Sequence, residues 1–179
     1  MHYLTTPLEI KSLTEEGRFA GYASLFGNVD NQKDVMERGA FARTLHEKGT
    51  AIKLLWQHRM DEPIGQIDRL FEDDKGLYVE GRLLLSLQRG REAYDLVKSG
   101  ALEGLSIGYR PVKYRIDPQT GIRHLQQVDL YEISLVTFPA NAAAGITVVK
   151  SGAIEEAVPA ALAVAFNDAI ARAIGSLRR

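Results

Sequence analysis

The sequence predicts a mainly β protein of the α+β class, in which about seven antiparallel strands close into a barrel with peripheral helices. Apolar or alternating runs of strand length recur along residues 1–150, separated by turn-forming residues. Consecutive runs are joined by hairpin turns, for example at residues 73–76 and 117–121, which favours antiparallel pairing. The strand–helix alternation of a doubly wound sheet is missing. Closure is expected because it removes unpaired strand edges.

The first part of the chain predicts two short strands, a polar loop and a helix. The strands, at residues 8–12 and 18–26, flank a turn, and the second mixes small and aromatic residues, as curved strands do. The loop at 27–34 lacks the glycine and the glutamate that a calcium loop needs at its sixth and twelfth positions, so no metal site is expected there. Residues 40–48 predict a helix that ends at Gly49.

The middle of the chain predicts a strand, a hairpin and a second helix. Residues 51–58 form a mostly apolar run of strand length. Residues 64–72 and 77–85 are expected to pair as a hairpin, since apolar and polar side chains alternate along the second run. Residues 91–99 predict a helix with an apolar face, and Gly100 stands at its C-terminal stop.

Three more strands are expected before a change in character near residue 150. They span residues 105–116, 122–138 and 146–149, the first two as a hairpin. Residues 1–150 are therefore expected to form the barrel domain.

Residues 151–179 are expected to form a C-terminal helical tail. Pro159 suits the first turn of a helix. One apolar stripe follows the helical repeat: Leu162, Phe166, Ile170, Ala173 and Leu177. This stripe fits a helix packed on its own domain, a docking or dimer helix, or a tail that is removed by cleavage.

The composition of the 179-residue chain excludes several classes of function. A net charge of -1 without a large basic block argues against a dedicated nucleic-acid binder. The absence of cysteine excludes a disulfide scaffold, a cysteine-ligated zinc site and a cysteine nucleophile. No apolar run approaches the roughly 18 residues of a membrane span, and the first residues do not resemble a signal peptide. We therefore expect a soluble, cytoplasmic protein without a cofactor.

Ser106 is the candidate nucleophile, because it stands between two glycines in the run Gly-Leu-Ser-Ile-Gly at 104–108. The pattern G-x-S-x-G is typical of the α/β-hydrolase elbow, which needs a strand, a sharp turn and a helix. Here Pro111 and further β-forming residues follow, so the serine lies within a strand and the elbow is excluded. The glycines then indicate either a close approach of a substrate backbone or a barrel corner without chemistry.

His58 is the candidate general base that a serine nucleophile needs within hydrogen-bond reach. It ends a buried-looking strand and opens onto a turn, where catalytic groups are often displayed. The other histidines are less suitable, since His2 is near the terminus, His46 lies on a charged helix and His124 lies beside a hairpin turn. Without Ser106, a satisfied, partly buried imidazole would explain His58 equally well.

Glu132 is the candidate for the third residue, which would hold the tautomer of the base. It is a carboxylate in the apolar run 131–136, where an unpaired charge is expensive to bury. Asp129 is the reserve candidate. In a regular strand the two acidic residues would face opposite sides, so that only one of them could meet the imidazole.

Five motifs occur in a fixed order within about residues 18–150. They are GYASLF at 21–26, RGAF at 38–41, LWQH at 55–58, GLSIGY at 104–109, and EISLVT with PAN at 132–141. Together they resemble the prohead (capsid maturation) serine proteases of tailed phages, a family similar in fold to the herpesvirus assemblins.

The resemblance implies a seven-stranded barrel ringed by helices, with Ser106 as nucleophile, His58 as base and Glu132 as the third member of a triad. It implies that the substrate is the scaffolding segment of the major capsid protein, cut inside the prohead in the host cytoplasm, followed by self-cleavage. It leaves a homo-oligomeric state open.

Two other classes of function remain as alternatives. One is a non-catalytic barrel that acts as a capsid scaffold or assembly factor. The other is a metal-dependent hydrolase that uses His58, Asp61 and Glu62, although adjacent residues on a turn rarely give a closed ligand set.

Overall fold

The computed structural model describes residues 2–7, 12–30, 32–102 and 104–137. The strand expected at 146–149 and the helical tail expected at 151–179 lie outside the described residues, as does most of the strand expected at 8–12.

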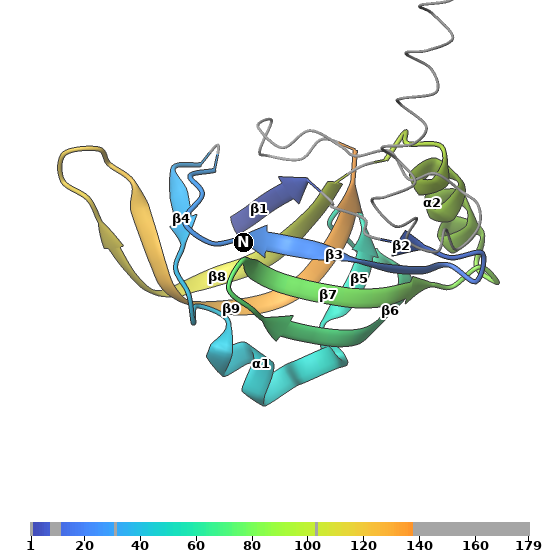
Figure 1. The fold of residues 1–179 in the computed structure, drawn as a ribbon, viewed down its shortest axis with the longest axis horizontal. Coiled ribbons are helices and arrows are strands. Elements are labelled where there is room, and N and C mark those ends of the chain that lie inside the picture. The colour runs from blue at the N-terminus through green and yellow to red at the C-terminus, as the bar shows by residue number, and fades with distance from the viewer. Residues whose placement is uncertain (1, 8–11, 31, 103, 138–179) are drawn as a thin grey trace, which may run out of the picture. The chain divides into compact units, whose positions relative to one another are not determined.

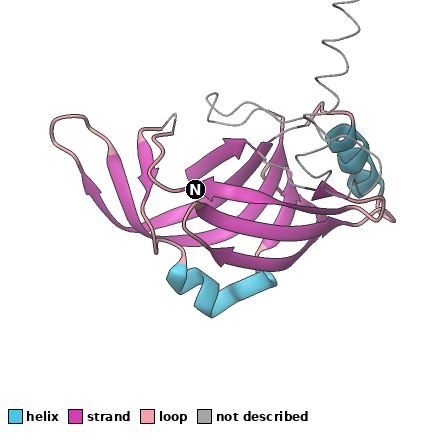
Figure 2. Ribbon diagram, viewed as in Figure 1, coloured by secondary structure: helices cyan, strands magenta, loops and turns pink. Residues whose placement is uncertain are grey.

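Strands make up most of the described chain (Figures 1 and 2), and they form one sheet. The strands are β1 (His2–Pro7), β2 (Ser12–Leu13), β3 (Arg18–Leu25), β4 (Asp34–Met36), β5 (Lys53–Trp56), β6 (Arg59–Glu72), β7 (Gly76–Leu83), β8 (Gly104–Ile116) and β9 (Arg123–Val136). Their order in the sheet is β1-β8-β9-β5-β6-β7-β3-β2, and β4 pairs with β9 outside this path. The mainly β class is confirmed.

The helices are few and lie outside the sheet (Figure 1). They are α1 (Ala42–Lys48), the short 3-10 turn η1 (Gly49–Ala51) and α2 (Gln88–Lys98). The two helices predicted within residues 1–150 are confirmed, with their first residues shifted by two or three positions. No helix in the described part of the chain is long and apolar enough to cross a membrane.

The expectation of a closed antiparallel barrel is wrong in two respects. Among the described strands the sheet is a curled half-barrel whose end strands, β1 and β2, do not pair with each other. Strand β2, at one end of the sheet, has only two residues, so the edge that it contributes is short. In addition, β4 and β5 both pair with β9 in parallel, since neither is joined to β9 by a hairpin.

One face of the sheet carries the hydrophobic core. On β8 and β9 the inward residues are fully buried or nearly so: Leu105, Ile107, Tyr109, Val128, Leu130, Ile133 and Leu135. The predicted hairpin is confirmed as β6 and β7, and β7 buries every second residue as the alternation indicated. The other face of β8 and β9 is therefore available for polar groups.

Strand β9 pairs with β4 near its start and with β5 near its end. Between these two pairings, α1 and the residues before it bond to the backbone of β9. The backbone N–H of Val128 donates to the Ala40 carbonyl at 2.9 Å. The Thr44 hydroxyl donates to the Val128 carbonyl at 3.0 Å and accepts from the Leu130 N–H at 3.2 Å. Lys48 Nζ donates to the Leu130 carbonyl at 3.0 Å. These contacts replace strand pairing and leave few backbone groups of β9 unsatisfied.

A buried ion pair ties β4 to the start of β9. Asp34 accepts two hydrogen bonds from the Arg123 guanidinium, at 2.7 and 2.5 Å, and one from the Tyr109 hydroxyl at 2.9 Å. The neighbouring carboxylate of Asp30 accepts the N–H groups of Gln32 and Asp34 on one oxygen, and its other oxygen is buried without a hydrogen-bond partner among the described residues. Burial raises the pKa of Asp30 above its ordinary value.

We predict that Thr44→Val lowers the free energy of unfolding by about 1–3 kcal/mol, because it leaves a buried N–H and a buried carbonyl without their partner while preserving side-chain shape. Urea unfolding monitored by circular dichroism measures the change. Ser24→Ala is the matched control, since Ser24 is also fully buried but its hydroxyl makes no hydrogen bond with described residues. Equal stabilities for the two variants would contradict the role of Thr44.

A second prediction concerns the pH dependence of stability. Because the pKa of Asp30 is raised, the folded chain binds this proton more tightly than the unfolded chain, so the contribution of Asp30 to stability falls as the pH rises above about 4. Asp30→Asn keeps an acceptor for the loop but cannot ionise. Relative to the parent chain, the variant should therefore gain stability between about pH 3 and pH 7 in urea titrations. A difference that does not vary with pH would refute this.

Candidate active site

A strained turn presents His58. Trp56 at the end of β5 pairs with Arg59 at the start of β6, so Gln57 and His58 form a two-residue hairpin loop. Both have positive φ, 49° and 60°, which matches the turn type that twisted strands prefer. Such loops usually contain glycine or asparagine, and a left-handed conformation costs free energy in other residues. The conformation must therefore be held by neighbouring groups.

Strand β9 supplies the groups that hold the turn. The N–H of Gln57 donates to the Leu135 carbonyl at 3.0 Å, and its side-chain amide donates to the Thr137 hydroxyl at 2.7 Å. The N–H of His58 donates to Ser134 Oγ at 3.1 Å. These bonds fix the backbone of His58 against β9.

The His58 ring lies against a buried carboxylate. Its Nδ1 is 2.7 Å from Glu132 Oε1, and the other carboxylate oxygen accepts the Ser134 hydroxyl at 2.6 Å. The Glu132 side chain is only 1% exposed, whereas that of His58 is 20% exposed. With Glu132 ionised, Nδ1 carries the proton and donates it to the carboxylate, so Nε2 is the ring nitrogen with acceptor character.

Ser106 lies on the same face of the sheet as this pair. In the register of β8 and β9, Ser106 is directly opposite Ser134, and Gly108 is directly opposite Glu132. Directly opposed side chains share a face, and the intervening residues of both strands point into the core. Ser106 is fully buried in this conformation of the chain. The structure thus gathers His58, Ser106 and Glu132 around the central part of β8 and β9.

Gly108 provides the space that Glu132 occupies. A Cβ atom at position 108 would lie 2.2 Å from Glu132 Oε1, the oxygen that meets His58. From the sequence, the glycines around Ser106 are expected to mark either the approach of a substrate backbone or a barrel corner. For Gly108 the structure gives a different cause, since any side chain there would displace the carboxylate.

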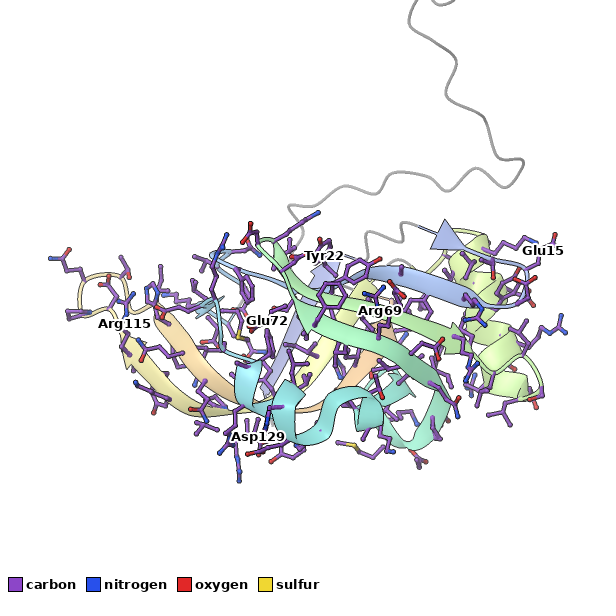
Figure 3. All side chains as sticks on the ribbon, turned by 60° about the horizontal axis from the view of Figure 1, so that its bottom comes forward. Glu15, Tyr22, Arg69, Glu72, Arg115 and Asp129 are labelled. Carbon is purple, nitrogen blue, oxygen red and sulfur yellow. The ribbon has the colours of Figure 1, made fainter. Side chains whose placement is uncertain are left out.

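Asp129, the reserve candidate, has different partners. It accepts hydrogen bonds from Lys48 at 3.1 Å, Arg110 at 3.0 Å and Tyr131 at 3.2 Å, beside α1 (Figure 3). Burial acts to raise the pKa of Asp129, but these donors and charges together hold the pKa below its usual value. The carboxylate that meets the imidazole is therefore Glu132.

The strand is also irregular between the two carboxylates. Gly108 pairs with Glu132 and Tyr109 with Leu130, which leaves Tyr131 as an extra residue. Leu130 and Ile133 consequently both point into the core, although they are three residues apart. Asp129 and Glu132 thus lie on the same face, because the regular strand that would put them on opposite faces is interrupted here.

The residues of the metal-hydrolase alternative are engaged elsewhere. Asp61 lies 3.3 Å from Arg59, and Glu62 lies 3.1 Å from Arg59 and 3.0 Å from Arg89. Within the described ranges, no three histidine, aspartate or glutamate side chains are grouped so that they could hold a metal ion. The arrangement instead leaves His58 as an imidazole oriented by a buried carboxylate.

Two of the other histidines lie outside this site. His46 is exposed on α1, and His124 is 3.3 Å from Glu37. An open groove of about 700 Å³ is found near His124, lined by apolar residues of β4 and by Phe26, and it includes none of the three candidate catalytic residues. The groove is therefore separate from the candidate active site.

Sequence reasoning missed Ser134 and the strained turn. A signal for Ser134 was present, because a serine two residues after Glu132 lies on the same side of a strand that is otherwise apolar. No local signal marked the turn, since Gln-His does not resemble the usual hairpin dipeptides.

Comparison with known proteins gives relatives among the proteins of tailed phages. The chain is 38% identical over 141 residues to the prohead protease of Enterobacteria phage HK97, covering 76% of this chain and 62% of that protein. It is 30% identical over 148 residues to the prohead protease of Escherichia phage T5, covering 79% and 68%. It also matches a capsid polyprotein of Pseudomonas phage PAJU2, at 36% identity over 155 residues, which are 80% of this chain and 22% of that protein.

The fold is similar to that of the bacteriophage T4 capsid assembly protease, with a TM-score of 0.58, 10% identity, and coverage of 75% of this chain and 97% of that chain. The family model of the caudovirus prohead serine proteases matches residues 6–158, which include the whole of the site. The chain spans about three fifths of the length of the HK97 relative. With a family match over most of its length, the chain belongs to the caudovirus prohead serine proteases.

Proposed function

We propose that this chain is a serine endopeptidase in which Ser106 is the nucleophile, His58 the general base and Glu132 the group that orients the base. The observation that carries the proposal is the 2.7 Å contact between His58 Nδ1 and the buried Glu132 carboxylate. That contact lies over Gly108, two residues along the same strand face from Ser106.

The chemistry follows from the tautomer that Glu132 imposes. With Nδ1 donating to the carboxylate, Nε2 accepts the proton of Ser106 as the oxygen attacks a peptide carbonyl. The resulting imidazolium is stabilised by the adjacent negative charge and then donates the proton to the leaving amine. Water, deprotonated by the same nitrogen, hydrolyses the acyl-enzyme and regenerates the serine.

The burial of Ser106 adds a condition to this mechanism. Because the residue has no exposed surface, a peptide reaches the hydroxyl only after a conformational opening.

We propose that the substrate is the scaffolding segment of the major capsid protein, cut inside the prohead in the host cytoplasm, and that the protease also cleaves itself. The names of the relatives support this, since two are prohead proteases and a third is a capsid polyprotein that contains a segment similar to this chain. Self-association of the chain is compatible with this proposal.

The decisive variant is Ser106→Ala. It should lower the rate of capsid-protein processing roughly a thousandfold or more and abolish covalent labelling by a fluorophosphonate probe, because no nucleophile remains. His58→Ala should give a similar loss. Mass spectrometry of the labelled peptide identifies the modified residue.

Ser24→Ala serves as the control for these measurements, because it removes a buried hydroxyl on β3 and should retain full activity. Persistent processing by Ser106→Ala would show that another residue is the nucleophile. Absence of labelling and processing in the parent chain would favour the non-catalytic assembly protein.

A further prediction tests the role of Gly108. Gly108→Ala should fold, since the group displaced is the flexible end of Glu132, but it should lower activity roughly 100-fold because the carboxylate leaves the imidazole. In a Glu132→Ala background, the same change should have little further effect, since no carboxylate remains to be displaced. If the increases in activation free energy from Gly108→Ala and Glu132→Ala were additive, Gly108 would act in another way.

A further inference from the structure

We infer that Ser134 is a positioning residue, whose hydroxyl locks the general base and the orienting carboxylate into one rigid unit. The inference rests on the proposed function and adds to it a residue that touches neither the substrate nor the reacting oxygen. It is drawn from the hydrogen bonds of Ser134 and from its place in the sheet.

The Ser134 hydroxyl joins two groups that must keep a fixed relation to each other. Its proton goes to Glu132 Oε2 at 2.6 Å, and its oxygen accepts the backbone N–H of His58 at 3.1 Å. A hydroxyl offers one donor and two acceptor sites, so both roles are filled without conflict. The other carboxylate oxygen, Glu132 Oε1, is bonded to His58 Nδ1, which closes a ring of contacts between the three residues.

The ring of contacts restrains the backbone of His58 and the rotation of the Glu132 carboxylate, which together set the direction of the imidazole. The bond to the His58 N–H holds a backbone conformation that is unfavourable for a residue other than glycine. The bond to Oε2 prevents rotation of the carboxylate about its last side-chain bond, so that Oε1 stays directed at Nδ1. Loss of the hydroxyl therefore loosens the imidazole from both sides.

The position of Ser134 also places the unit beside the nucleophile. Its Cα lies directly across from that of Ser106 in the antiparallel register of β8 and β9. Side chains so opposed are immediate neighbours on one face of the sheet. A shift of the imidazole permitted by loss of the Ser134 hydroxyl would thus change its distance to the reacting oxygen directly.

Ser24 offers a comparison for this hydroxyl. Ser24 is equally buried on β3, yet its oxygen has no hydrogen-bond partner among the described residues, so the fold tolerates a buried serine that binds nothing. The Ser134 hydroxyl instead donates to the Glu132 carboxylate and accepts from the backbone N–H of His58. Ser24→Ala is therefore a matched control for Ser134→Ala.

The test compares the rate constant for fluorophosphonate labelling of Ser106 in the parent chain, Ser134→Ala and Ser24→Ala. We expect Ser134→Ala to lower this constant roughly 10- to 100-fold, the range for loss of a hydrogen bond to a buried charge, and Ser24→Ala to leave it unchanged. A parent-like rate for Ser134→Ala would overturn the inference.

A double-mutant cycle separates positioning from general damage. In a Glu132→Gln background, Ser134→Ala should lower the rate constant by a smaller factor than in the parent chain, because the hydroxyl then has no charged group to orient and only its bond to the His58 N–H is lost. If the two substitutions lowered the labelling rate constant by independent factors that multiply, the inference would be overturned. Ser134 would then act independently of Glu132.

A spectroscopic readout distinguishes failure of this inference from failure of the proposed function. The His58 Nδ1 proton, bonded to Glu132, should give a low-field NMR signal in the full-length protein, and Ser134→Ala should broaden or shift it while Ser24→Ala does not. An unchanged signal would overturn the inference even if Ser106 is the nucleophile. If Ser106→Ala is labelled as fast as the parent chain, the proposed function fails, and this signal alone decides whether Ser134 positions the pair.

Discussion

The carboxylate of Glu132 lies almost fully buried on a central strand, and the neighbouring structure is arranged around its charge. Removing a carboxylate from water costs several kcal/mol unless hydrogen bonds replace the lost hydration. His58 and Ser134 each donate to one of its oxygens, and Gly108 leaves the space in which the group lies. The same contacts therefore stabilise the buried charge and orient the imidazole.

The parallel pairing of β5 with β9 brings the histidine to this carboxylate. Trp56, at the end of β5, lies opposite Leu135, so the turn that follows is placed above the C-terminal half of β9. Helix α1 covers the earlier interval of the same edge, through Thr44. Strand β9 thus lies at the centre of the candidate site, because β8 carries Ser106 on one side of it and the turn after β5 carries His58 on the other.

The sequence predicted the parts of the site that depend on local pattern. Ser106 between glycines, Glu132 in an apolar run and His58 at a strand end were each recognisable from residue type and neighbours. The hairpin of β6 and β7 followed from alternation in the same way. These features are encoded by residues close together in the chain.

The features that the sequence did not predict depend on contacts between distant residues. Strand β1 is defined by its pairing with β8, and β4 begins at Asp34, the last residue of the run that reads as a polar loop. The parallel pairings depend on which edge of β9 remains open once β8 has paired. Ser134 acquires its role only through the turn at His58, which lies 76 positions earlier in the chain.

The extra residue at Tyr131 has the largest chemical consequence, because it puts two carboxylates on one face in unlike surroundings. Asp129 is surrounded by Lys48, Arg110 and, at 3.9 Å, Arg43, so its charge is compensated by fixed cations. Glu132 is hydrogen-bonded instead to a neutral hydroxyl and an imidazole. Its charge is therefore the one placed to stabilise an imidazolium, whereas that of Asp129 is already compensated, so the two carboxylates differ in their environments more than in their residue type.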